Sequence, residues 1–298
     1  MLKLLGAYKN GNYTVKVLPD GTKIRETNED EFIPSFAENC DVKITDRCDG
    51  GCPFCYEGCT PYGRHGDILN YKFLDTLHPY TELAINGNDL SHPDLIPLLE
   101  KMKDKHIITN MTVNQIHFER HYDFISELIS KKLIYGLGVS LKNPTEDFVS
   151  KIKKFPNAVI HCINGILSPS DYEILRDNDL KMLILGYKQL RRGVVYYESN
   201  GDEVHELQNW LYDNLEDMLN HFKVVSFDNL AIEQLEVKRL LEEDQWEEFY
   251  MGDDGKYTFY IDMVDGTFGK NSLATDRYPI MDSIDEMFQK ILNEGVKL

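Results

Sequence analysis

The sequence predicts an α/β fold: a partial (β/α)6 barrel of parallel strands, with an N-terminal β-hairpin and a C-terminal α+β extension. Between residues 41 and 226, short β-branched or apolar runs alternate with amphipathic segments. Strands separated by helical crossovers pair in parallel, because each connection must travel back along the sheet. A length of 298 residues, with 42% hydrophobic and 28% charged content, suits one large core and excludes disordered or collagen-like chains.

Residues 1–40 contain the predicted hairpin. Runs 13–18 and 22–25 flank Pro19-Asp20-Gly21, a turn whose glycine supplies the positive φ that a tight hairpin requires.

Residues 41–226 form the predicted barrel. The strand candidates are residues 42–44, 82–85, 107–113, 136–141, 158–163 and 182–185. Segments 94–103 and 118–131 each keep an apolar face at helical spacing and are typical of the crossover helices between such strands.

Residues 227–298 form the predicted extension, which follows an acidic helix near residues 203–222. We expect a helical stretch through Trp246, a hairpin from runs 257–262 and 266–268, and a final amphipathic helix around residues 284–292. No flexible linker interrupts the chain, so one compact body with terminal additions is expected.

The charge balance restricts the partners. Fifty acidic against thirty-two basic residues give a net charge of −18, which repels phosphate backbones and anionic membrane surfaces. No apolar run reaches the roughly 18 residues that a membrane span needs. We therefore expect no nucleic-acid substrate, no membrane association and a cytoplasmic location.

The cysteine pattern carries the chemistry. The first strand leads into Cys48-Asp49-Gly50-Gly51-Cys52-Pro53-Phe54-Cys55. Three thiolates at this spacing on one loop can each bind one iron of a [4Fe–4S] cluster, which leaves the fourth iron free for a small molecule. A structural zinc site that also uses Cys59 is the alternative, but zinc ligands usually come as two pairs from separated segments.

This C-x3-C-x2-C pattern, with Phe54 before its third cysteine, resembles the radical S-adenosylmethionine (radical SAM) superfamily. The resemblance implies two cofactors, a [4Fe–4S] cluster and SAM, and an oxygen-sensitive enzyme. In that superfamily the cluster reductively cleaves SAM to a 5′-deoxyadenosyl radical, which abstracts hydrogen from a substrate. The resemblance makes Cys48, Cys52 and Cys55 the metal ligands and places Phe54 and Tyr56 beside the cofactors.

Further positions carry the same resemblance. Asn86-Gly87-Asn88, after the second strand, is similar to the superfamily's Gly-Gly-Glu segment that receives the SAM ammonium, and Leu90-Ser91-His92-Pro93-Asp94-Leu95 follows it. Asn88 stands where Glu is usual, and its amide oxygen accepts a hydrogen bond without charge assistance. A simple turn role for Asn88 is the alternative.

Polar residues at the ends of later strands complete the candidate site. Thr112 and Asn114 end the third strand, and Ser140 ends the fourth in a run similar to the superfamily's Ser-x-Asp element. Lys188, Arg191 and Arg192 follow the sixth strand as a positive island for the SAM carboxylate, a substrate carboxylate or an acidic electron donor such as flavodoxin or ferredoxin. A solvated loop is the alternative for this island.

The remaining cysteines and histidines are interpreted as structural. We expect Cys59 to be a loop thiol, Cys40 and Cys162 to be packed, His161 to be a hydrogen-bonded core residue, and His65 and His92 to lie in loops. The substrate is then a peptide or protein residue or a small metabolite, and no residue is assigned to the reaction on it. The alternative function is a non-catalytic scaffold that keeps the barrel and binds a cluster or ligand.

Overall fold

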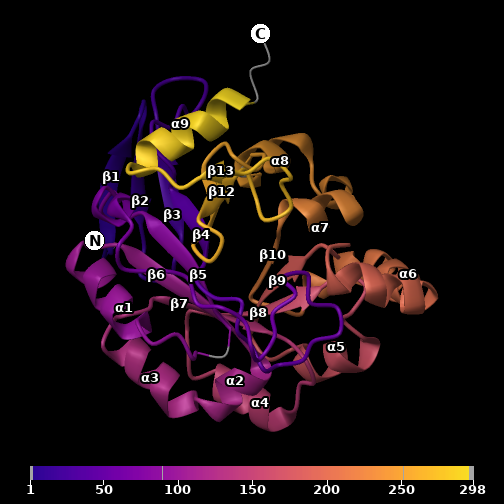
Figure 1. Cartoon of the computed structure of the whole chain (residues 1–298). Helices are drawn as coiled ribbons and strands as arrows, with labels where there is room; N and C mark the ends of the chain where they lie inside the picture. The colour runs from indigo at the N-terminus through magenta and orange to yellow at the C-terminus, as the bar shows by residue number, and fades with distance from the viewer. Residues whose placement is uncertain (1–2, 89, 251, 295–298) are drawn as a thin grey trace.

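The computed structural model describes residues 3–88, 90–250 and 252–294 and has a mixed α/β architecture (Figure 1). Its centre is one ten-stranded sheet of order β10-β9-β8-β7-β6-β5-β4-β11-β12-β13, and a separate three-stranded sheet holds the N-terminal strands. The large sheet is mostly parallel and open, with β10 at one edge and β13 at the other. The described strands thus form an open sheet of ten strands, longer than the six-stranded partial barrel that the sequence predicts.

All six strands expected between residues 41 and 226 are present, and they pair in chain order and in parallel. They are β4 (Asn39–Lys43), β5 (Glu82–Asn88), β6 (Ile108–Asn114), β7 (Gly136–Ser140), β8 (Ala158–Ile163) and β9 (Lys181–Leu185).

Helices follow most of these strands and form an arc around the sheet (Figure 1). They are η1 (Lys72–Asp75), α1 (Leu95–Asp104), α2 (Gln115–Arg120), α3 (Tyr122–Ser130), α4 (Glu146–Ile152), α5 (Pro169–Leu175) and α6 (Arg192–Met218). The helix expected over residues 118–131 is two helices that meet at His121, whose φ of −115° and ψ of 29° are not helical. The first of them, α2, begins directly at the end of β6, where Asn114 caps it.

The N-terminal sheet confirms the predicted hairpin and adds a strand. Strands β2 (Tyr13–Val17) and β3 (Lys23–Glu26) pair antiparallel, and β1 (Gly6–Asn10) pairs with β2 on the other side. The buried Glu38 carboxylate fixes this sheet to the body, since it accepts hydrogen bonds from Tyr13 Oη (2.7 Å) and Arg25 Nη2 (2.6 Å).

The last part of the chain extends the large sheet at both ends. Strand β10 (Val224–Phe227) pairs with β9, whereas β11 (Thr258–Asp262) returns to pair in parallel with β4 and continues into β12 (Thr267–Gly269) and β13 (Tyr278–Pro279). The helices of this part are α7 (Asn229–Gln234), η2 (Val237–Leu240), α8 (Glu243–Phe249) and α9 (Ile284–Glu294). Within the described residues, no helix combines the length and apolarity needed to cross a bilayer.

Candidate functional site

The two faces of the parallel sheet differ in chemistry. The face toward the helices is apolar and buried, and its side chains include Val42, Ile85, Met111, Val139, Ile160 and Met182. The strand register places a polar set on the opposite face, all of it at least partly accessible: Asp41, Asn110, Thr112, Ser140 and His161. We call this second side the open face, and its polarity distinguishes it from the apolar face that packs against the helices.

The loop after β4, which carries the cysteines, is fixed at its base. Backbone bridges join Arg47 to Thr60 and Thr45 to His65, and Cys48 N donates to Thr60 O at 2.9 Å. Cys48, Cys52 and Cys55 are partly accessible, whereas Cys59 is buried. The loop therefore presents three of its four thiols at the carboxyl end of β4.

Nearby donors contact two of the three predicted ligands. Gly50 N donates to Cys48 Sγ at 3.4 Å, and Asn114 Nδ2 donates to Cys52 Sγ at 3.3 Å. Asn114 also caps α2, since its Oδ1 accepts from Ile116 N at 3.0 Å. The amide at the end of β6 thus connects the strand, the helix and the cysteine loop.

The thiol pKa values reflect local contacts. A hydrogen bond from the Cys59 thiol is the main reason that the pKa of Cys55 falls to about 6, and the same contact raises the pKa of Cys59. Burial raises the pKa of Cys52, although the nearby cations Lys142 and Arg192 act in the opposite direction. Cys59, predicted as a loop thiol, is thus buried in the loop as a direct neighbour of the predicted ligand Cys55.

Among the described residues, no group of three or more His, Cys, Asp or Glu side chains is arranged to hold a metal ion. The prediction that Cys48, Cys52 and Cys55 are cluster ligands is therefore not established by the geometry of the site.

Asn86 and Asn88 hold the base of the cysteine loop. Asn86 Oδ1 accepts from Ile44 N at 2.7 Å, and Asn88 Nδ2 donates to Thr45 O at 3.1 Å and to Cys59 Sγ at 3.4 Å. Gly87 lies between them because a Cβ there would come within 2.8 Å of Met111 Cγ. The segment compared with Gly-Gly-Glu lies beside the cysteine loop, but its described contacts are structural.

The loop after β9 also reaches the cysteine loop. Lys188 Nζ lies 4.4 Å from the centroid of the Tyr56 ring and 3.3 Å from Ser272 Oγ. The Arg191 guanidinium donates to Glu57 O, and Arg192 Nε is buried without a hydrogen-bond partner. On the other flank, the Phe54 ring packs edge-on against Tyr196 with centroids 5.7 Å apart. Two cations of the predicted positive island are therefore engaged by the protein.

The register brings polar strand ends side by side. It pairs Asn114 with Ser140 and Ser140 with His161, and Thr112 lies two pairs earlier, beside Gly138. A Cβ on Gly138 would lie 2.5 Å from His161 Cε1, so the imidazole covers this glycine on the open face. Burial lowers the pKa of His161 to about 4.

Sequence reasoning assigned His161 to the core. The structure confirms that the ring is largely covered, but it places the ring on the polar face, and the described contacts include no hydrogen bond to it. This position can be recognised once the strands are aligned, because His161 then pairs with Ser140 and Ser140 with Asn114.

Sequence reasoning also missed a polar group below the cysteine loop. Asp49 Oδ1 lies 2.5 Å from Nε2 of the buried His117, and Asp49 Oδ2 accepts from Arg120 at 2.7 Å. The hydrogen bond from His117, followed by that from Arg120, lowers the pKa of Asp49 to about 2. Lys142 Nζ donates to Gly50 O at 2.9 Å. Helix α2 and the loop after β7 thus fix the cysteine loop from a second side.

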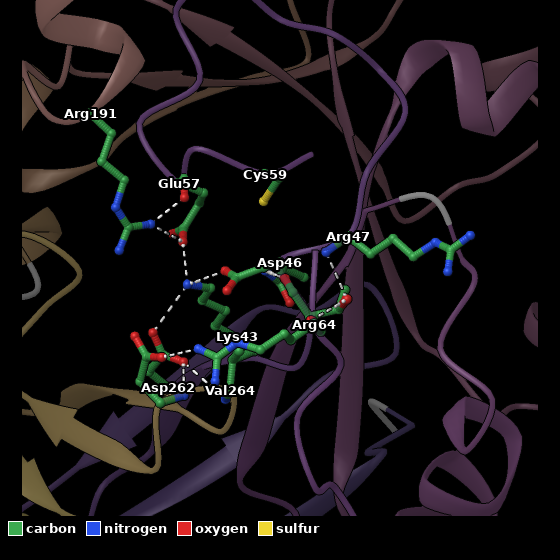
Figure 2. Close-up of polar contacts among 12 residues, drawn as sticks. Lys43, Asp46, Arg47, Glu57, Cys59, Arg64, Arg191, Asp262 and Val264 are labelled. Atoms are coloured by element: carbon green, nitrogen blue, oxygen red, sulfur yellow. Dashed lines mark hydrogen bonds and ion pairs between the residues drawn. The ribbon is translucent and has the colours of Figure 1, made fainter. Parts of the chain in front are cut away.

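A buried cation joins the cysteine loop to β11 (Figure 2). Lys43, only 2% exposed, places Nζ 2.6 Å from Asp46, 3.4 Å from Glu57 and 3.2 Å from Asp262. Burial lowers the pKa of Lys43, but the three carboxylates outweigh this effect and hold it above its usual range. Arg191 reaches Glu57 from the opposite side.

Comparison with known proteins supports the fold. No family model matches the sequence, and no curated protein sequence matches it significantly. The structure is similar to the crystal structure of SuiB from Streptococcus suis bound to S-adenosylmethionine, with a TM-score of 0.53 and 14% sequence identity. The match covers 86% of this chain and 64% of the SuiB chain, so this chain corresponds to less than two thirds of SuiB.

Proposed function

We propose that this chain is a radical SAM enzyme that abstracts hydrogen from a peptide or protein residue or from a small metabolite. The observation that carries the proposal is the three-cysteine loop at the carboxyl end of β4, next to the open polar face of a parallel sheet. The similarity to a structure bound to S-adenosylmethionine supports it at the level of the fold. The open sheet then corresponds to a partial (β/α)6 barrel, extended by β10 and β11.

The donor set fits a [4Fe–4S] cluster better than a single metal ion. In such a cluster each thiolate binds a different iron, so the three sulfurs do not need to converge on one point. Hydrogen bonds from Gly50 N and Asn114 Nδ2 to the sulfurs match the contacts that tune such clusters. The partnerless Arg192 Nε and the nearby Lys142 supply positive charge next to the thiolates.

When bound, the cluster would supply the electron that cleaves SAM, so that a 5′-deoxyadenosyl radical starts the reaction on the substrate. The chain's own residues would bind and orient SAM and the substrate, and would exclude water from them. Thr112, Asn114 and Ser140 offer hydroxyl and amide groups along the strand ends, where ligands of such folds bind. The Phe54 ring packs on Tyr196 and the Tyr56 ring on Lys188, so both aromatic residues of the loop are held by neighbouring side chains.

The partners follow from charge. A net charge of −18 disfavours nucleic acid and anionic membranes, so we propose a peptide, protein or small-molecule substrate in the cytoplasm. The electron donor is proposed to be an acidic flavodoxin or ferredoxin that meets Arg191, whose side chain stays half exposed beside the cysteine loop.

Anaerobic reconstitution tests the proposal. We expect about four irons per chain, and 5′-deoxyadenosine on addition of SAM and dithionite. Alanine at Cys48, Cys52 or Cys55 should abolish both, whereas Cys162→Ala, a buried thiol on the helix-facing side of β8, should change neither. Stoichiometric zinc in protein purified without oxygen would contradict the cluster, and iron binding without 5′-deoxyadenosine would favour a non-catalytic scaffold.

A further inference from the structure

A cavity of about 300 Å³ lies outside the cysteine site, between α6, α7 and the loop after β9. Helix α6 bends at Asn200, whose φ of −133° is not helical. The bend separates Tyr197 on the first segment from Gln208, Asn209 and Tyr212 on the second, and all four line the cavity. The cavity is therefore built by the kink and is not a gap between unrelated surfaces.

Three side-chain amides that line this cavity have no protein partner. No hydrogen bond is described for Gln189, Gln208 or Asn209, which lie on the loop after β9 and on α6. Gln234, a further lining residue, is fully engaged, since it accepts from Asn164 and bonds both the N–H and the carbonyl of Tyr187. Each free amide offers one carbonyl acceptor and an NH2 donor, so the wall is equipped for a ligand with both.

The lining is uncharged in a chain of which 28% is charged. The hydroxyls of Tyr197 and Tyr212 are already bonded to His205 (2.5 Å) and Glu236 (3.0 Å), and the Arg239 guanidinium stacks on the Tyr212 ring, 3.9 Å from its centroid. The charges behind the lining are thus already paired with these tyrosines, and the lining residues themselves offer none to a charged ligand. Tyrosine rings with adaptable side-chain amides and few charges are typical of surfaces that recognise polypeptides.

We propose that this cavity binds an uncharged stretch of the peptide substrate through its backbone amides, an inference that rests on the proposed function. A peptide group presents an N–H donor beside a carbonyl acceptor, which matches the free side-chain amides. The volume equals that of roughly ten water molecules at about 30 Å³ each, enough for a few peptide groups and too little for a folded partner.

The position of the cavity suits substrate recognition. Tyr196 packs on Phe54 of the cysteine loop, and the next residue, Tyr197, lines the cavity. Tyr187 also lines the cavity, and its hydroxyl donates to Gly193 O at 2.9 Å. A peptide held in the cavity would thus lie against the segment of α6 that contacts the cysteine loop.

Hydrogen–deuterium exchange on the full chain without cluster or SAM tests this site. We expect millimolar N-acetylated, C-amidated tetraglycine to slow exchange over residues 187–197 and 205–212, and equimolar glucose to have no effect. The double variant Gln208→Glu/Asn209→Asp keeps the shape but adds charge, and should bind the probe at least about tenfold more weakly. Asn214→Asp is the matched control on the same helix, outside the cavity, and should bind within about twofold of wild type.

Three outcomes would overturn the assignment: no protection by the peptide, equal binding by the charged variant, or protection by glucose in place of the peptide. Because the measurement uses neither iron nor SAM, a negative result refutes the cavity assignment alone. A failure to form 5′-deoxyadenosine refutes the radical function and, with it, the role of the bound peptide as its substrate, whereas protection by the peptide would still show that the cavity binds it.

Discussion

Replacing Lys43 with Met should strongly destabilise the protein. Nζ lies within 3.4 Å of three carboxylates, and at an effective dielectric constant of about 20 each contact is worth roughly 5–6 kcal/mol before desolvation. Desolvation offsets most of this attraction, but removal of the cation leaves Asp46, Glu57 and Asp262 close together without it. We expect the free energy of unfolding to fall by about 3–5 kcal/mol, measured by urea denaturation followed by circular dichroism.

Two further variants test the reasoning. Lys43→Met/Asp262→Asn removes one of the uncompensated charges and should recover about 1–2 kcal/mol of the loss. Lys16→Met breaks the exposed pair with Glu26 (2.6 Å) and should cost less than about 1 kcal/mol. The reasoning is refuted if Lys43→Met costs no more than Lys16→Met, because the buried cation would then contribute only as much as a surface lysine.

Three other predictions concern the site. The pKa of His161 is about 4 in the folded protein, below the usual 6.5, so the unfolded chain binds the proton more readily. The free energy of unfolding should therefore fall by up to ~3 kcal/mol as the pH drops from about 6.5 to 4. His161→Gln should lose this pH dependence when denaturation is measured at a series of pH values. Asn114→Ala should cost about 1 kcal/mol through the lost cap of α2, and Asn114→Ser should recover most of it in urea titrations. Cys59→Ala should retain the iron of the reconstituted protein, because Cys59 is not expected to be a ligand: a fourth thiolate would occupy the iron to which SAM binds. Loss of iron in this variant would instead show a site with four cysteine ligands.

The sequence predicts the six central strands because their alternation and spacing are local properties. It does not predict β10 or the place of β11. Val224–Phe227 is short and follows a long helix, and the pairing of Tyr260 with Asp41 depends on a contact across most of the chain. Local pattern cannot show which strand completes an edge.

The residues of the candidate site likewise differ in whether a local sequence pattern predicts them. The cysteine spacing is a contiguous motif, so it could be interpreted directly, and Asn114 could be placed beside it as the end of the third strand. The face on which His161 lies depends on the register with Ser140, and Lys43 escaped notice because its three partners are distributed between the cysteine loop and β11. Contacts between distant segments define these residues, and a single sequence does not contain that information.

Because β11 pairs with β4, the first strand of the large sheet waits for a partner that is synthesised near the end of the chain. Lys43 and Asp262 are 219 residues apart, so a ribosome that adds about 5–20 residues per second needs roughly 10–40 s between them. During that time β4 is an unpaired sheet edge, and such edges recruit other chains. Nascent chains that stop before residue 258 should therefore aggregate, and any factor that shields residues 39–43 during synthesis would raise the yield of folded protein.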